Sequence, residues 1–262
     1  MLSFPNAKIN LGLHVLAKRE DGYHGLESCF YPIAWKDSLE IVPSASFSFE
    51  SYGLKIPGNA SENLCVKAYE LIKSDYDISP VETHLLKSIP MGAGLGGGSA
   101  NGAFMLKLLN DHFKLGISVL KLQEYALRLG SDCPFFIENK PVIAKGRGEV
   151  FGQVNLDLTG HYLALKNPEV HISTKEAFAG ISLTTHQIGI SEILELPISK
   201  WRKNLVNDFE TSIFPNYPEV AKLKDDMYSS GALYASLTGS GSTVYGIFGE
   251  KPENSNWMIL EM

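Results

Sequence analysis

Apolar and polar residues alternate with two different periods along this chain, and these periods predict strands and helices in mixed order. Ile9, Leu11, Leu13 and Val15 alternate with polar or small neighbours. This period of two indicates a strand with one buried face. The same kind of pattern, or a short apolar run bounded by turn residues, predicts further strands over residues 28–35, 37–42, 46–52, 81–89, 161–165, 232–238 and 244–248.

Other segments repeat apolar residues every three or four positions, which predicts helices. The strongest are residues 64–72, 100–113, 118–129 and 218–229, with weaker helical features over 174–178 and 201–209. Ser61 is the expected cap of the first helix and Ser118 that of the third, which Gly130 ends. Residues 180–199 read as a variable loop region, and residues 249–262 have no clear pattern. The expected organisation is an N-terminal domain over residues 1–153 and a C-terminal domain over 154–262.

A glycine-rich stretch stands between the strand predicted at 81–89 and the helix predicted from residue 100. Five of the seven residues from Gly92 to Gly98 are glycine. Glycines let backbone N–H groups turn toward an anion, and the first turn of the following helix adds unpaired N–H groups and the positive end of its dipole. Ser99 supplies a hydroxyl beside that turn. The layout therefore predicts a phosphate-binding loop, and flexible linkers rarely stand between two well-patterned apolar elements.

The loop does not fit two common nucleotide motifs. No Lys-Ser or Lys-Thr pair follows the glycines, so it is not a Walker A loop. Gly92, Gly94 and Gly97 satisfy the dinucleotide pattern GxGxxG, but a segment this rich in glycine satisfies many patterns by chance. The acidic residue expected about 20 positions further on is missing as well. A dinucleotide-dependent oxidoreductase is accordingly a weak alternative.

Composition narrows the class of protein and its surroundings. The 262 residues carry a formal net charge of −6, which argues against a nucleic-acid surface. No run approaches 18 apolar residues, and the N-terminus lacks a signal-peptide layout, so we expect no membrane span and a cytoplasmic location. Cys29, Cys65 and Cys133 form no CxxC pair, which favours reduced thiols, and Cys65 falls on the apolar stripe of its helix.

Side chains at three further turns each have a structural and a functional interpretation. Tyr23 and His24 follow the turn Asp21-Gly22, and residues of this kind are either ordinary surface groups or ligand contacts. Asp132 follows the end of a predicted helix and precedes Pro134. It is either a turn residue or a functional carboxylate. The small turn 239–241 separates two predicted strands and is either a simple β-turn or a partner of the glycine loop.

Three segments together resemble the GHMP small-molecule kinases. They are the strand Ala7-Lys8-Ile9-Asn10-Leu11, the loop from Pro90 to Asn101, and Leu237-Thr238-Gly239-Ser240-Gly241. They occur in the family's order and span nearly the whole chain. The resemblance implies a two-domain α/β (α+β) fold, with an N-terminal domain of the ribosomal-S5-like kind and a C-terminal domain of the ferredoxin-like kind.

The resemblance is closer to one branch of the family, because of Asp21-Gly22-Tyr23-His24, the triple glycine before Ser99, and Gly-Ser-Asp-Cys-Pro-Phe-Phe around Asp132. This branch implies a phosphotransferase that uses ATP and Mg²⁺ to phosphorylate the 2-hydroxyl of methylerythritol in its cytidine diphosphate adduct. The reaction belongs to the non-mevalonate route to isoprenoid precursors. The implied partner is this small molecule, without nucleic acid or membrane, and the sequence leaves monomer and homodimer open.

The resemblance also assigns roles by position. Asp132 matches the catalytic aspartate and Lys8 its lysine partner. Asn10, Tyr23, His24 and Phe178 match positions that hold the acceptor, with Tyr23 and Phe178 stacking on the pyrimidine and His24 reading its edge. Mg²⁺ would be held by the ATP phosphates, with Ser99 as a candidate protein ligand. The implied ATP-binding loop comprises Pro90, Met91, Gly92, Ala93, Gly94, Leu95, Gly96, Gly97, Gly98, Ser99 and Ala100.

The sequence departs from the family pattern at three places and leaves two rival functions. Ala100 replaces a second small hydroxyl residue, Gly102 weakens the first turns of its helix, and the chain is short after Phe248. One rival is a GHMP kinase that acts on a different alcohol. The other is a nucleotide-binding protein without turnover, against which the presence of both Lys8 and Asp132 argues.

Overall fold

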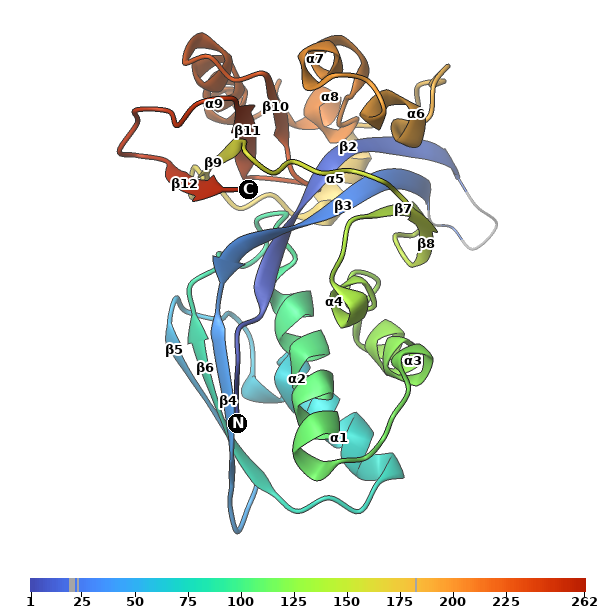
Figure 1. Cartoon of the computed structure of the whole chain (residues 1–262), viewed down its shortest axis with the longest axis vertical. Coiled ribbons are helices and arrows are strands. Elements are labelled where there is room, and N and C mark those ends of the chain that lie inside the picture. Colours follow the sequence, from blue (N-terminus) through green and yellow to red (C-terminus); the bar gives the residue numbers. More distant parts are fainter. Residues whose placement is uncertain (19–21, 23, 182) are drawn as a thin grey trace. The chain divides into compact units, whose positions relative to one another are not determined.

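The computed structural model describes residues 1–18, 22, 24–181 and 183–262, and it divides into two compact units (Figure 1). Unit 1 comprises Met1–Ala7, Trp35–Met91 and Gly96–Lys140, and unit 2 comprises Lys8–Ala34, Gly92–Leu95 and Pro141–Met262. Each unit is therefore built from separate stretches of chain. The expected boundary at residue 153 concerns the family's domains and stays a prediction.

Unit 1 is a four-stranded sheet with helices on one face. The sheet order is β1-β4-β6-β5, with β5 parallel to β6 and the other pairs antiparallel. Its elements are β1 (Leu2–Ser3), β4 (Ser38–Pro43), β5 (Ser48–Gly53), a 3-10 turn (Ala60–Glu62), α1 (Leu64–Asp75), β6 (Val81–Lys87), α2 (Gly97–Phe113), α3 (Val119–Leu129) and α4 (Phe135–Glu138). Figure 1 shows α1 and α2 alongside this sheet.

The core of unit 1 follows from the period of two in β6. Val81, Thr83, Leu85 and Lys87 are buried, whereas the intervening residues are more exposed. Successive strand residues point to opposite faces, so these four share the face that the helices cover. Lys87 is thus in phase with the apolar residues, and its charge enters the core together with them.

Unit 2 contains two further four-stranded sheets, in the orders β2-β3-β7-β8 and β10-β11-β9-β12. Its strands are β2 (Asn6–Lys18), whose first two residues belong to unit 1, β3 (His24–Lys36), whose last two also do, β7 (Val142–Gly146), β8 (Val150–Gln153), β9 (Tyr162–Lys166), β10 (Tyr234–Leu237), β11 (Val244–Phe248) and β12 (Met258–Glu261). Its helices are α5 (Thr174–Ala179), α6 (Ile190–Leu194), α7 (Trp201–Asn204), α8 (Phe209–Ile213) and α9 (Pro218–Ser229), with a 3-10 turn at Ile198–Lys200.

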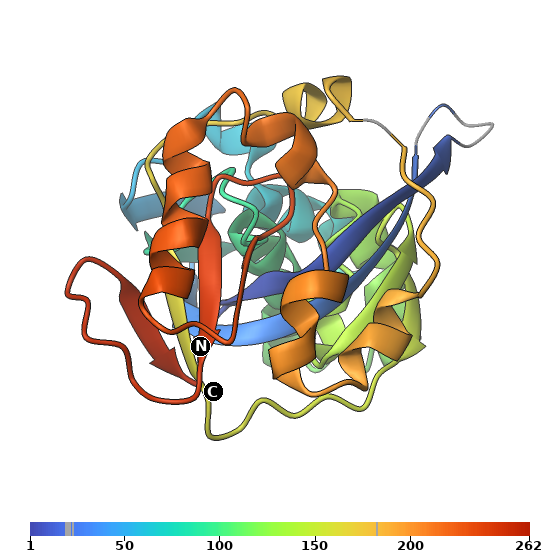
Figure 2. The same cartoon turned by 90° about the horizontal axis from the view of Figure 1, so that it is seen from above.

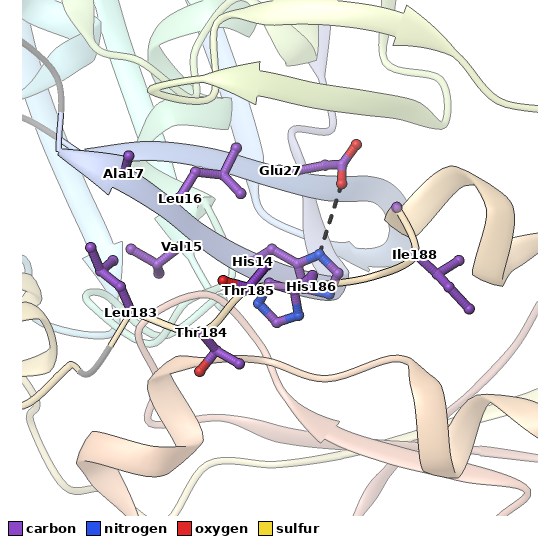
Figure 3. Close-up of a pocket in the computed structure, with 11 residues that line it drawn as sticks. His14, Val15, Leu16, Ala17, Glu27, Leu183, Thr184, Thr185, His186 and Ile188 are labelled. Atoms are coloured by element: carbon purple, nitrogen blue, oxygen red, sulfur yellow. Dashed lines mark ion pairs between the residues drawn. The ribbon is translucent and has the colours of Figure 1, made fainter.

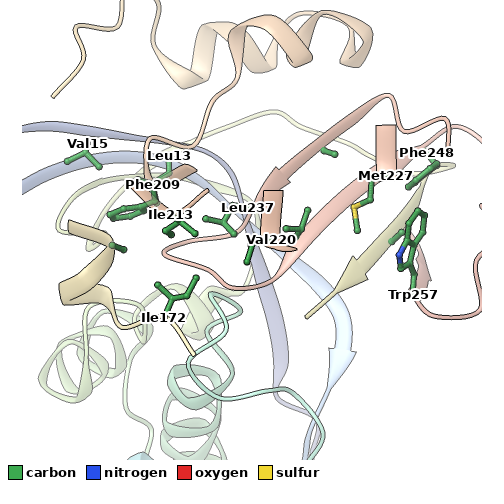
Figure 4. Packing of buried hydrophobic residues seen from close by; sticks show 14 residues of the cluster. Leu13, Val15, Ile172, Phe209, Ile213, Val220, Met227, Leu237, Phe248 and Trp257 are labelled. Atoms are coloured by element: carbon green, nitrogen blue, oxygen red, sulfur yellow. The ribbon is translucent and has the colours of Figure 1, made fainter. Parts of the chain in front are cut away.

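The core of unit 2 joins α9 to the strands β10 and β11. Val220 and Met227 of α9 belong to one buried cluster with Leu237, Val244 and residues from β2, α5 and α8 (Figure 4). Figure 2 shows α9 lying along these strands. Each such side chain contributes roughly 1.5–3 kcal/mol by its removal from water.

Most of the predicted elements are present, and each difference has a cause in the hydrogen bonding. Asn63, not Ser61, caps α1, because its side chain accepts a hydrogen bond from the Cys65 N–H. The helical prediction over 201–209 was wrong in part, since the chain between α7 and α8 is extended and Leu13 donates to Val206 O. The predicted loop region 180–199 includes the short helix α6. The unplaced C-terminus forms β12, antiparallel to β9.

Candidate active site

The glycine loop owes its shape to three alternate glycines. Gly92, Gly94 and Gly96 have φ values of 63°, 77° and 68°, in the left-handed region that other residues rarely adopt. Gly96 is also the residue before α2, and it has no side chain with which to cap the helix. The first N–H groups of α2 therefore have no side-chain cap, and the expected binding of an anion by this loop stays a prediction.

The three family segments meet within unit 2. The Asn10 N–H donates to Thr238 Oγ1 (3.0 Å), and that hydroxyl lies 3.1 Å from Gly94 O. The Lys8 N–H donates to Leu95 O (2.9 Å). A Cβ on Gly94 would lie 1.9 Å from Thr238 O, so only glycine permits this approach. The turn at 239–241 is therefore the partner of the glycine loop.

Thr238 and Asn207 complete this junction, and neither was among the site residues expected from sequence. Thr238 belongs to the quoted Leu-Thr-Gly-Ser-Gly motif, which was the signal that could have identified it. Asn207 donates from Nδ2 to Leu237 O (2.8 Å) and Gly239 O (2.9 Å), and so holds the turn in place. Its role depends on contacts about thirty residues away, so no local pattern indicates it.

Lys8 and Asn10 are hydrogen-bonded to each other at this junction. Lys8 is 3% exposed, and its ammonium donates to Asn10 Oδ1 (2.6 Å) and lies 4.6 Å from the centroid of the Phe30 ring. Asn10 in turn donates from Nδ2 to Ser28 Oγ (2.8 Å). The contacts of Asn10 therefore orient Lys8. The expected contact of Asn10 with substrate stays a prediction.

Asp132 occupies the turn after α3, where the Cys133 N–H donates to Gly130 O (3.1 Å). Cys133 is buried, and burial raises the pKa of its thiol to about 12, while a hydrogen bond with Ser99 opposes the shift. Ser99, in the first turn of α2, is thereby placed beside the Asp132 turn within unit 1. The expected pairing of Asp132 with Lys8 stays a prediction.

Two of the residues expected to hold the pyrimidine, His24 and Phe178, lie in unit 2. The rings of His24 and Phe178 are stacked, with centroids 5.2 Å apart and planes 17° from parallel. Phe178 also meets Phe209 edge to face, at 4.9 Å. His24 opens β3, and Phe178 belongs to α5, so the fold brings together two of the predicted aromatic positions. Tyr23 lies outside the described residues.

A cavity of about 120 Å³ lies in unit 1 beside the N-terminus of α2. Its walls combine apolar groups with carboxamides, and its lining residues are Ile56, Pro57, Asn59, Glu62, Asn63, Leu64, Met91, Gly98 and Asn101. Apolar walls with a few polar groups suit a nucleobase. Met91 and Gly98 were expected in the ATP loop. Asn63 was not identified from sequence, and Asn101, which ends the quoted loop segment, was given no role.

A buried ion pair supports the chain on both sides of the glycine loop. Asp37 is hydrogen-bonded to Lys87, and its other oxygen accepts from the Ser88 N–H (2.7 Å) and Ile89 N–H (2.9 Å). Both charged side chains are fully buried. Burial lowers the pKa of Lys87, and the Asp37 carboxylate opposes this shift. A Cβ on Gly97 would come within 2.8 Å of Lys87 Nζ.

A second cavity, of about 400 Å³, lies in unit 2 on β2 and β3 (Figure 3). His14 and His186 line it, and their rings are stacked with centroids 3.5 Å apart. His186 Nε2 is 2.9 Å from Asp208 Oδ2, and His14 Nδ1 is 3.8 Å from Glu27 Oε2. Burial and the neighbouring His186 lower the pKa of His14 to about 4. His14 is therefore neutral at neutral pH.

Two of the sequence departures have packing reasons. Ala100 is fully buried, so a hydroxyl at this position would enter the core of unit 1. A Cβ on Gly102 would lie 2.8 Å from Leu64 Cβ, so glycine permits α1 and α2 to approach. The helix-weakening glycine is thus compensated by closer packing.

Two other classes of site are absent from the part of the chain that the structure describes. In that part of the chain, no group of three or more His, Cys, Asp or Glu side chains has the geometry to hold a metal ion. No helix there combines the length and apolar character needed to cross a bilayer.

Comparison with known proteins identifies the family. Residues 63–140 match the model of the GHMP kinases N terminal domain, and residues 191–256 match that of the GHMP kinases C terminal domain. A homoserine kinase from Cytophaga hutchinsonii (TM-score 0.66, 16% identity) and a mevalonate kinase from Methanococcus jannaschii (TM-score 0.71, 13% identity) share the fold. These neighbours cover 94% and 100% of this chain, and the chain covers 85% and 98% of theirs.

Closer relatives indicate one branch. A 4-diphosphocytidyl-2-C-methyl-D-erythritol kinase from Cytophaga hutchinsonii is 52% identical over 97% of this chain and 94% of its own, and one from Bacteroides thetaiotaomicron is 49% identical with the same coverage. The crystal structure of a 4-(cytidine 5'-diphospho)-2C-methyl-D-erythritol kinase superposes with a TM-score of 0.80 at 29% identity, covering 94% of this chain and 90% of that one. The chain therefore belongs to the GHMP kinase family, together with these relatives.

Proposed function

We propose that the protein transfers the γ-phosphoryl group of ATP to the 2-hydroxyl of 4-diphosphocytidyl-2-C-methyl-D-erythritol. ATP is the phosphate donor of GHMP kinases. The observation that carries the proposal is the junction of Lys8, Asn10, Gly94 and Thr238, which joins all three family segments. The names of the relatives supply the acceptor, and the nearness of His24 to Phe178, both expected at its pyrimidine, supports this choice.

The triphosphate would lie against the glycine loop, with its purine in the cavity of unit 1. Alternating left-handed glycines and the start of α2 present backbone N–H groups to an anion. The cavity adjoins this helix start through Gly98, and Leu64 and Met91 supply apolar contact for a flat base. The base and the phosphates would therefore be held by adjacent parts of the same chain segment.

The acceptor chemistry would fall to Asp132 and Lys8. A tertiary alcohol is a weak nucleophile at neutral pH, and a carboxylate within hydrogen-bond reach can orient it and take its proton. A lysine beside that carboxylate favours its charged form and adds positive charge where the phosphoryl group passes. Asn10 would keep the Lys8 ammonium in place, since it accepts its hydrogen bond at 2.6 Å.

Mg²⁺ fits this chain as an ion that the nucleotide brings with it. Mg²⁺ is usually held by one or two protein groups plus substrate phosphates. The described residues offer no cluster of three metal-binding side chains, and Ser99 in the first turn of α2 is the candidate protein ligand. When bound, the ion would neutralise charge on the phosphate oxygens. We also propose a cytoplasmic location, which the three buried, free cysteines support.

The proposal is tested by coupled measurement of ADP release with Mg-ATP and four alcohols. The acceptors are 4-diphosphocytidyl-2-C-methyl-D-erythritol, mevalonate, homoserine and galactose. We expect turnover with the cytidine compound alone. Turnover with another alcohol would keep the kinase class and reject the acceptor. ATP binding without turnover on any of the four would favour a non-catalytic nucleotide-binding protein.

The role of Asp132 is tested in the same assay. Asp132→Asn removes the proton acceptor while nearly keeping the size of the side chain, so the rate should fall by at least 100-fold. ATP binding, measured by calorimetry, should stay within a factor of about two. A variant that keeps more than a tenth of the wild-type rate would contradict this role.

A further inference from the structure

Asn101 contributes to the nucleotide cavity from the second turn of α2. It is 2% exposed and lines the cavity together with Asn63 and Leu64. A carboxamide has a donating end and an accepting end of nearly equal size. The end that faces a bound base decides whether the base must donate or accept a hydrogen bond. The protein groups that bond to Asn101 therefore influence which base can bind in the cavity.

Asp37 fixes which end of Asn101 is available. The Asn101 Nδ2 donates to Asp37 Oδ2 at 2.9 Å. An ionised carboxylate only accepts hydrogen bonds, so the amide nitrogen must face it. The carboxamide oxygen is then the free end, and within the described ranges no group donates a hydrogen bond to it. A ligand that donates a hydrogen bond at this point would complete the group.

Asp37 is itself held by contacts that leave it little freedom. Its backbone N–H donates to Pro5 O (2.8 Å), and its carboxylate binds the N–H groups of Ser88 and Ile89 as well as Lys87. Lys87 balances the charge of the carboxylate inside the core, where an unpaired charge is costly. The orientation of Asn101 is therefore set by a rigid, neutral pair that does not line the cavity.

We propose that Asp37, paired with Lys87, is a positioning residue that directs the Asn101 oxygen toward the purine and thereby selects 6-amino purine nucleotides over 6-oxo ones. Adenine carries a donating amino group at position 6, whereas guanine and hypoxanthine carry an accepting oxygen there. Two acceptors would face each other if a 6-oxo purine bound. The inference rests on the placement of the purine in this cavity under the proposed function.

The test compares ATP with inosine triphosphate, whose purine carries an accepting oxygen at position 6 in place of the amino group and a proton on N1. We expect the wild type to prefer ATP in kcat/KM by about 10- to 100-fold, the usual cost of one mismatched hydrogen bond in a base-reading site. Asp37→Asn combined with Lys87→Met removes the carboxylate without leaving a buried charge. In this double variant Asn101 can turn over, and the preference should fall by about tenfold through the KM of the nucleotide.

Three controls separate selection from general damage. Glu210→Gln with Lys224→Met removes a partly buried ion pair of unit 2 and should keep the wild-type preference. Asn101→Ala should lower the preference by itself, and adding the Asp37 and Lys87 changes to it should have no further effect on the ratio. Thermal unfolding of every variant shows that the compared proteins are folded.

Two outcomes distinguish failure of the inference from failure of the purine placement. Ile56→Trp fills the cavity from its coil wall and should raise the KM of ATP at least tenfold. If it does not, the purine binds elsewhere and the placement is wrong. If it does, but the preference for ATP is unchanged in the Asp37 and Lys87 double variant, the placement stands and the inference is overturned.

Discussion

The two units of this kinase each bury a polar cluster, and the clusters differ in how completely they are satisfied. In unit 1, Asp37 accepts from Lys87, Ser88, Ile89 and Asn101, so positive and negative charge are balanced. In unit 2, His14 and His186 stack beside Glu27 and Asp208, and His14 Nε2 is buried without a hydrogen-bond partner among the described residues. Both oxygens of Asp37 are hydrogen-bonded, whereas one ring nitrogen of His14 is not.

The difference indicates what each cluster contributes. The charge-balanced cluster of unit 1 anchors the chain on both sides of the glycine loop. Burial disfavours the charged form of His14, so protonation of this ring should destabilise the fold. The nucleotide loop therefore rests on paired charges, whereas the β2 region of unit 2 should respond to acid.

The largest effect is expected when one partner of the Asp37 pair is removed alone. Lys87→Met leaves a buried carboxylate without its counter-ion, which should lower the free energy of unfolding by about 3–5 kcal/mol. Urea unfolding at pH 7.5 measures this loss. The double variant Asp37→Asn with Lys87→Met should lose much less, because it leaves no buried charge. A single variant within 1 kcal/mol of the wild type would show that the pair is not needed.

Low pH should lower the stability of the protein through the histidine cluster of unit 2. The pKa of His14 is lowered from 6.5 to about 4 in the folded protein, so below pH 6.5 the unfolded chain binds a proton that the folded protein does not. His14 thus contributes stability that is fully present above pH 6.5 and lost as the pH falls toward 4, about 3 kcal/mol in total.

This contribution is measured by urea unfolding between pH 4 and pH 8 on the wild type and on His14→Phe, which keeps an aromatic ring but cannot titrate. Carboxylates titrate in both proteins, so the difference between the two curves reports His14. The free-energy difference should change by at most about 1.4 kcal/mol per pH unit within this window. Parallel curves would contradict the low pKa of His14.

The smallest effect should follow from removing the second ring. His186→Asn takes away the one neighbouring group that lowers the pKa of His14, so that pKa should rise from about 4. It should stay below 6.5, because burial is the larger cause. Titration of labelled histidine rings by NMR measures the shift. An unchanged or lower pKa of His14 would mean that the stacked ring has no electrostatic effect on it.

The sequence predicted elements well where local signals are complete. The helix 218–229 and the strand 244–248 agree with α9 and β11 at both ends, and Ser118 caps α3 as expected. Signals were weaker where an element depends on a distant partner. Residues 258–261 form a strand because they pair with β9, about a hundred residues earlier, and nothing in their own pattern requires it.

The candidate site divides in the same way. The glycine loop and the turn at 239–241 were visible because their glycines serve the local backbone, and the structure joins them at Gly94 and Thr238. Asp37 and Asn101 were not identified, since their link spans 64 positions of the chain. Lys87 did leave a signal, because a lysine stood in phase with the buried face of its strand.

The discontinuous units also constrain how the chain folds as it is synthesised. Unit 1 takes all of its residues from the first 140, so it can be completed on the ribosome while almost half of the protein is still unmade. The first segment of unit 2, Lys8–Ala34, leaves the exit tunnel earlier. It can form its hydrogen bonds with Asp208 and Thr238 only after those residues are synthesised. Until then β2 lacks the hydrogen bonds that Thr238 and Asp208 supply to it, so this segment completes its contacts only late in synthesis.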